Sequence, residues 1–185
     1  GSPQHLLEHA VRNPILDDDF TLGTFPVVLS SQFLFRDGLI ARGLQVGRLL
    51  DLSQATFEGP TAFFGARVGG DVNFRQAVFR EDAVFDRMRV EGNLYCNPTF
   101  FEGRARFGGA EISGQAGFHE ARFAQDATFD HFRVGGNLYC VSVEFAGETR
   151  FLAAEIGGQA AFQGASFGGK ALFDVPMFRG KNSVD

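Results

Sequence analysis

Few side chains in this sequence have the type and spacing that catalysis or metal binding requires. His5 and His9 lie one helical turn apart, a spacing that can chelate a metal ion, but no third ligand accompanies them. His119 and His131 are isolated, and the sequence contains no Ser-His-Asp set, no Gly-rich phosphate loop and no Cys-His cluster. We therefore expect no enzymatic activity, no cofactor and no metal site.

Two tyrosines are the best candidates for a binding surface. RVEGNLYC at residues 89–96 and RVGGNLYC at residues 133–140 differ at one position, and each contains one of the two tyrosines of the chain, Tyr95 and Tyr139. Exposed aromatic side chains often anchor protein partners. Their arrangement depends on the elements that position them.

Those elements are indicated by an 11-residue repeat. Mostly apolar residues recur every 11 positions in two interleaved series, and a small or apolar residue precedes most of them by two positions. The first series is Val46, Phe57, Val68, Phe79, Val90, Phe101, Ile112, Phe123, Val134, Phe145, Ile156, Phe167 and Phe178. The second is Leu52, Phe63, Phe74, Phe85, Cys96, Phe107, Phe118, Phe129, Cys140, Phe151, Phe162 and Phe173. A spacing of two places both side chains on one face of an extended segment.

Strands are favoured over the right-handed helical coiled coil that shares the 11-residue period. Gly-Gly pairs such as those at 69–70 and 157–158 would each cost about 2 kcal/mol inside a helix. Gly-containing segments recur every 22 residues, which indicates one turn with alternating sides of five and six residues. We predict an all-β solenoid, a four-sided β-helix of about seven turns, over residues 28–178. Residues 1–27 are predicted to form a cap with a short helix and an extended segment, and residues 179–185 a tail.

The predicted core conserves volume within each layer. Its inward residues include Phe57, Phe74, Phe79, Phe85, Cys96, Phe107, Phe118, Phe123, Phe129, Cys140, Phe151 and Phe162. Leu stands two positions before each Cys of this column, whereas Ala116 stands two before Phe118, as close packing demands.

The two cysteines should lie about 9.6 Å apart, too far for a disulfide. Two buried free thiols fit a reducing compartment, so we expect a cytoplasmic protein.

Polar columns predict ladders along the surface. Arg89, Glu111, Arg133 and Glu155 recur every 22 residues with alternating charge. Asp71, Asn93, Gln115, Asn137 and Gln159 recur at one corner, where their side chains can form hydrogen bonds from turn to turn. Both columns are predicted to stabilise the solenoid.

The tyrosines share an outward column. Tyr95 and Tyr139 are predicted to lie two turns apart with Gly117 stacked between them, which predicts a slot one turn deep with Gly117 as its floor. His119 is expected beside the slot. An ordinary exposed strand surface is the alternative interpretation.

The repeat unit, a small or apolar residue two positions before a large apolar one, resembles the pentapeptide-repeat family over roughly residues 28–178. The resemblance implies a right-handed quadrilateral β-helix in a bacterial repeat protein. The family unit usually has five residues throughout, whereas this chain inserts one residue at every second corner. We therefore expect wider or bulged corners on two opposite edges. Because some members dimerise through their C-terminal ends, the resemblance also implies a possible homodimer.

Composition narrows the choice of function. The formal net charge is −5, which does not suggest a nucleic-acid-binding protein, and no apolar run approaches the ~20 residues of a membrane span. We favour a non-catalytic protein-interaction scaffold whose partner the sequence does not identify. The alternative is a DNA mimic that binds DNA gyrase or topoisomerase, as some pentapeptide-repeat proteins do. Acids and bases alternate in residues 28–185, so no phosphate-like stripe is evident. A sugar-binding or lyase β-helix would need a catalytic groove that the sequence does not show.

Overall fold

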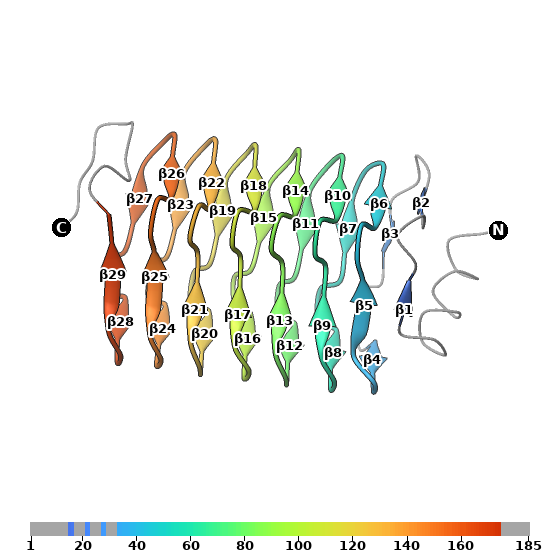
Figure 1. The fold of residues 1–185 in the computed structure, drawn as a ribbon, viewed down its shortest axis with the longest axis horizontal. Helices are drawn as coiled ribbons and strands as arrows, with labels where there is room; N and C mark the ends of the chain where they lie inside the picture. The colour runs from blue at the N-terminus through green and yellow to red at the C-terminus, as the bar shows by residue number, and fades with distance from the viewer. Residues whose placement is uncertain (1–14, 17–20, 23–26, 29–32, 175–185) are drawn as a thin grey trace.

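The structure, a computed structural model, is an all-β solenoid with four parallel sheets (Figure 1). It describes residues 15–16, 21–22, 27–28 and 33–174. All regular secondary structure in these residues is β-strand, which confirms the predicted four-sided all-β solenoid. The continuous part makes about six turns, close to the predicted seven. No helix in the described part of the chain has the length and apolar character needed to cross a bilayer.

Each turn contributes one strand to each of four sheets, named A to D in chain order. Sheet A contains β1 (Ile15–Leu16), β5 (Leu39–Ala41), β9 (Thr61–Ala62), β13 (Ala83–Val84), β17 (Ala105–Arg106), β21 (Ala127–Thr128), β25 (Thr149–Phe151) and β29 (Ala171–Phe173). Sheet B contains β2 (Thr21–Leu22), β6 (Gln45–Val46), β10 (Arg67–Val68), β14 (Arg89–Val90), β18 (Glu111–Ile112), β22 (Arg133–Val134) and β26 (Glu155–Ile156).

The other two sides follow the same order. Sheet C contains β3 (Val27–Val28), β7 (Leu50–Asp51), β11 (Val72–Asn73), β15 (Leu94–Tyr95), β19 (Ala116–Gly117), β23 (Leu138–Tyr139) and β27 (Ala160–Ala161). Sheet D contains β4 (Leu34–Phe35), β8 (Thr56–Phe57), β12 (Val78–Phe79), β16 (Phe100–Phe101), β20 (Arg122–Phe123), β24 (Glu144–Phe145) and β28 (Ser166–Phe167).

The register confirms the 22-residue turn. Arg67 pairs with Arg89, and Leu94 pairs with Ala116, each 22 residues further along the chain. Pairing already begins at β1, where Ile15 pairs with Ile40, so strands form before residue 28, the predicted start of the β-helix. The predicted cap helix and the tail at residues 179–185 lie outside the described residues.

The extra residue of each six-residue side lies at two opposite corners, as expected. From β5 onward, strand starts are six residues apart from sheet A to B and from C to D, and five residues apart at the other two steps. At both six-residue corners the chain enters the left-handed region, with positive φ at Gly43, Gly65, Arg87, Gly109, His131 and Ala153 on corner A–B and at Gln54, Gln76, Glu120, Ser142 and Gly164 on corner C–D. Among the described five-residue corners, only the one at Gly38 also enters this region, so the left-handed turn mainly accompanies the inserted residue.

Phenylalanines form two stacked columns inside the solenoid. Along sheet D, the rings of Phe57 and Phe79 stack with centroids 4.7 Å apart. Along sheet A, Phe85 and Phe107 stack at 4.6 Å. The columns meet edge to face, for example Phe79 against Phe85 at an interplanar angle of 89°. Such pairs add to the stabilisation from burial because the ring edge is positive and the ring face negative.

The structure buries all the predicted core residues except Phe162, which is partly buried and packs against the core from the last complete turn. The cysteine layers show how the core keeps its density. Around Cys96 the larger residues are Met88, Leu94 and Thr99, whereas the next layer has Ala110, Ala116 and Ala121 around Phe118. Around Cys140 they are Phe132, Leu138 and Val143. Volume is thus conserved around the whole layer, not only between the two residues that the sequence pattern singled out.

Side-chain oxygens link successive turns at the corners. Asp71 Oδ1 accepts a hydrogen bond from the Asn93 backbone N–H at 2.7 Å, and Asn93 Oδ1 accepts one from Gln115 N–H at 2.9 Å. Asn137 Oδ1 accepts a bond from Gln159 N–H at 2.8 Å in the same column. Each bond satisfies a backbone donor of the next turn, so this column stabilises the stacking of the turns.

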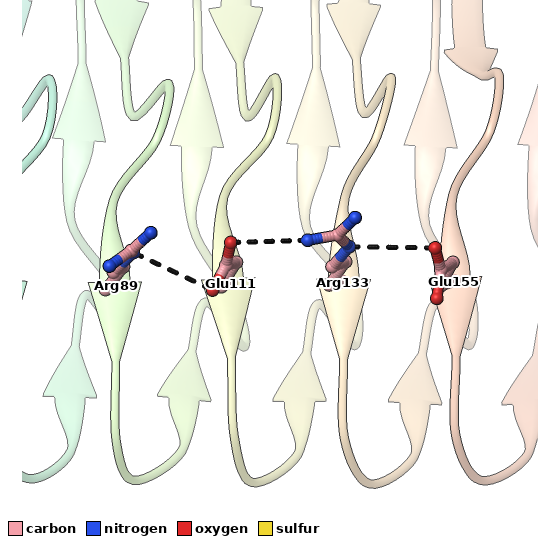
Figure 2. Close-up of polar contacts among 4 residues, drawn as sticks. All are labelled: Arg89, Glu111, Arg133 and Glu155. Atoms are coloured by element: carbon pink, nitrogen blue, oxygen red, sulfur yellow. Dashed lines mark hydrogen bonds and ion pairs between the residues drawn. The ribbon is translucent and has the colours of Figure 1, made fainter.

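The alternating column on sheet B forms the predicted charge ladder (Figure 2). Glu111 lies between Arg89, at 3.7 Å, and Arg133, at 3.5 Å. Arg133 also contacts Glu155 at 3.7 Å. All four side chains are well exposed, so each pair contributes at most about 1 kcal/mol to the free energy of unfolding.

Candidate functional site

The two tyrosines lie where the sequence predicted them. Tyr95 on β15 and Tyr139 on β23 both pair in register with Gly117 on β19, so the three occupy neighbouring positions on the outer surface of sheet C. The two rings therefore lie two turns apart on one face of the solenoid. Both tyrosines are half-buried.

Neighbouring side chains hold both rings. The Arg75 guanidinium lies over the Tyr95 ring, 4.1 Å from its centroid, in a cation–π contact. The His119 and Tyr139 rings lie nearly parallel with centroids 5.3 Å apart. Asn137 Nδ2 donates a hydrogen bond to the Tyr139 hydroxyl at 2.7 Å. His119 therefore belongs to this surface through its contact with Tyr139.

Gly117 is a covered position rather than an open floor. It is buried, and Asn97 Oδ1 lies 3.5 Å from the place that a Cβ on Gly117 would take. The Asn97 oxygen is itself buried and accepts no hydrogen bond from a described residue. Asn97 thus covers Gly117, which was predicted to be the open floor of a slot one turn deep. We define the tyrosine surface as Tyr95, Tyr139, His119, Arg75 and Asn97.

A second candidate is an open groove along corner A–B, which we call the arginine groove. It consists of two adjoining hollows that share Phe64, Gly65, Asp86 and Arg106. Its further lining residues include Arg42, Arg67, Arg87, Arg89, Glu111, Asp130, His131 and Arg133. Phe64 is 40% exposed in this groove, and a Cβ on Gly65 would meet no atom within 4 Å. The groove is therefore accessible to a partner along its length.

Two aspartates in the groove have structural partners. Asp86 is 7% exposed; its Oδ1 accepts the Gly108 backbone N–H at 2.7 Å and its Oδ2 pairs with Arg106. Asp130 repeats this arrangement two turns later with the Leu152 N–H and Arg150. Both carboxylates thus neutralise one arginine and satisfy a backbone donor of the next turn.

The arginine groove was not predicted from the sequence. Arg89 was assigned only to the alternating column of the charge ladder. One signal was available: Arg67 precedes Arg89 in the same column with no acid between them, which breaks the alternation. The contribution of Phe64 and Arg87 from corner A–B depends on how that corner faces sheet B, and the periodicity alone does not give this.

The cysteines and histidines of the chain are the remaining candidates for reactive or metal-binding groups. Cys96 and Cys140 are buried free thiols, and burial raises the pKa of both well above the ordinary value, so neither is activated as a nucleophile. His131 lies exposed in the arginine groove. No group of three possible metal ligands occurs within the described ranges, and His5 and His9 lie outside them.

Comparison with known proteins supports the assignment of the repeat. Residues 46–95 match the sequence model of the family described as Pentapeptide repeats (9 copies). The 22-residue strand register of this segment continues unchanged to β29. No curated protein and no solved structure matches the chain.

Proposed function

We propose that this chain is a non-catalytic protein that binds a protein partner through the tyrosine surface. The chain forms a β-helical scaffold whose repeat and 22-residue turn are consistent with the pentapeptide-repeat family. The supporting observation is the pair of tyrosines in one register on sheet C, each held by a planar neighbour. Aromatic side chains held in place lose little rotamer entropy on binding and bury a large area, as hot-spot residues do.

The position of the two tyrosines outside the core allows recognition to be tested separately from folding. Tyr95 and Tyr139 are half-buried on the outer face of sheet C, so removing them leaves the inward residues Leu94 and Leu138 in place. Their replacement removes a cation–π contact, a ring stack and a hydrogen bond, so we expect it to lower the free energy of unfolding by roughly 1–2 kcal/mol without disrupting the core. Loss of partner binding by a variant that is still folded at the assay temperature would separate recognition from folding.

The experiment is affinity capture from a lysate with wild-type protein and the Tyr95→Ala/Tyr139→Ala variant. The matched control is Thr56→Ala/Phe100→Ala, which changes two half-buried outward residues that are also two turns apart, on the neighbouring sheet D. We expect a protein that wild type and control capture and the tyrosine variant does not. Equal capture by all three, each still folded at the assay temperature, would refute the tyrosine surface as the binding site.

The DNA-mimic alternative has less support from the charges. A gyrase-binding mimic needs a long acidic surface, whereas the ladder on sheet B alternates between arginine and glutamate (Figure 2). The arginine groove on corner A–B adds further positive charge. Capture of gyrase or topoisomerase by the wild-type chain would favour the mimic. The expected C-terminal homodimer and cytoplasmic location remain predictions.

A further inference from the structure

The arginine groove is positively charged on a chain whose formal net charge is −5. Between residues 42 and 112, sheets A and B and their shared corner carry five arginines, Arg42, Arg67, Arg87, Arg89 and Arg106. The same surface carries only two acids, Asp86 and Glu111. Positive charge is thus gathered on one edge of the N-terminal half of the solenoid.

The two acids do not neutralise this edge. Asp86 pairs with Arg106, and Glu111 is shared between Arg89 and Arg133. Arg42, Arg67 and Arg87 have no ion pair with any residue that the structure describes. Three guanidinium groups in one groove are therefore available to an external anionic partner.

Arg67 interrupts the charge ladder. The column alternates from Arg89 to Glu155, but Arg67 on β10 pairs in register with Arg89 on β14, so two like charges lie side by side. Like charges opposite each other on neighbouring strands are destabilising. An acid at position 67 would instead extend the ladder by one favourable pair, so stability does not explain the arginine.

Arg87 is also disfavoured by its local conformation. It has φ of 57°, and the equivalent positions one turn before and after it are Gly65 and Gly109. A non-glycine residue in the left-handed region costs roughly 1 kcal/mol relative to glycine. The Arg87 guanidinium lies 5.8 Å from the centroid of the exposed Phe64 ring, so charge and apolar surface lie together in the groove.

We propose that the arginine groove binds an acidic peptide segment of a partner protein, with its carboxylates on Arg67, Arg87 and Arg42 and an apolar side chain on Phe64. From the turn of Arg42 to that of Arg106 is about 14 Å, the length of roughly four residues of extended peptide. Arginine binds carboxylates in bidentate geometry, which gives such a segment direction and register. This inference rests on the proposed scaffold role and concerns a different face from the tyrosine surface.

The shape and charges favour a peptide over two other anions. Small-molecule sites enclose most of their ligand, whereas this groove is open along the solenoid. Nucleic-acid sites follow a phosphate backbone with many successive cations. Here Glu111 and Asp130 interrupt the positive charge, and they would repel a continuous phosphate backbone. A short segment whose acids can be spaced to match the arginines avoids both carboxylates.

The test measures binding of a short fluorescein-labelled peptide of alternating glutamate and serine with a central phenylalanine, by fluorescence anisotropy at low salt. Arg67→Glu completes the charge alternation, and Arg87→Gly places glycine at a position with left-handed backbone conformation. Both variants should therefore melt no lower than wild type. Each should weaken binding about tenfold, a loss of ~1.4 kcal/mol. The matched control is Arg48→Glu, an exposed arginine at corner B–C whose equivalents in the next two turns are Gly70 and Gly92.

The expected result is binding that falls with salt, disappears when glutamine replaces glutamate in the peptide, and stays within about twofold in Arg48→Glu. The Tyr95→Ala/Tyr139→Ala variant should bind this peptide normally, so failure of the tyrosine surface and failure of the groove can be told apart. The proposal is overturned if wild type does not bind the peptide, if Arg48→Glu weakens binding as much as Arg67→Glu, or if a fluorescent oligothymidylate binds the groove more tightly.

Discussion

Replacing Phe118 by cysteine tests whether core volume is conserved within each layer. The Phe118 ring packs edge to face against Phe107 and Phe129, with centroids 5.5 Å away in both cases. Its removal leaves a cavity in a layer whose other variable positions are alanines. We expect Phe118→Cys to lower the free energy of unfolding by about 3 kcal/mol. Ala116→Leu in the wild-type background should overpack the same layer and cost roughly 1–3 kcal/mol.

The natural cysteine layers show which changes should restore the packing. Adding Ala116→Leu to Phe118→Cys copies the pair Leu94 and Cys96 and should recover part of the loss. Adding Ala110→Met and Ala121→Thr as well copies Met88 and Thr99 of that layer. The quadruple variant should then lie within about 1.5 kcal/mol of wild type, since volume-conserving changes in a core are tolerated.

The assay is urea unfolding followed by circular dichroism, with the slope m checked for each variant, and a thermal scan beside it. For a chain of 185 residues, 1 kcal/mol corresponds to roughly 2–4 °C in melting temperature, so Phe118→Cys should melt about 6–12 °C below wild type. A quadruple variant as unstable as the single one would refute conservation within the layer. In that case the stability of the core would depend on the alternation of cysteine and phenylalanine layers along the solenoid, and not on the volume within one layer.

Three further measurements test the buried and polar groups. Because burial raises the pKa of the Cys96 and Cys140 thiols, both should resist iodoacetamide at pH 8 in the folded chain and react only with denaturant; labelling at the rate of a free thiol would contradict their burial. Asp86→Ala should cost about 1–3 kcal/mol because it leaves a backbone donor and Arg106 without their partner, whereas the exposed Asp82→Ala should cost less than about 1 kcal/mol; equal melting temperatures for the two variants would be inconsistent with this. Glu111→Gln removes the centre of the charge ladder and should lower stability by less than about 1 kcal/mol at low salt and by nearly nothing in 1 M NaCl; a loss that persists in high salt would indicate packing instead of charge.

The sequence alone predicted the solenoid, because a β-helix has a one-dimensional pattern. Each turn repeats the environment of the previous one, so the 22-residue period of residues such as Val90 and Ile112 gives the register directly. The inward faces, the charge ladder and the common column of Tyr95, Gly117 and Tyr139 follow from the same period. Stacking at one strand spacing leaves few alternative arrangements.

Only the tertiary structure shows which side chains of different columns contact one another. Three features depended on it: the Asn97 side chain that covers Gly117, the part of Met88 and Phe132 in filling the cysteine layers, and the groove in which Arg67, Arg87 and Phe64 meet. These residues belong to different sides or corners of the solenoid. The period states which residues stack along the axis, but contacts around a turn depend on the left-handed corners and on the lengths of individual side chains, which a repeat pattern does not contain.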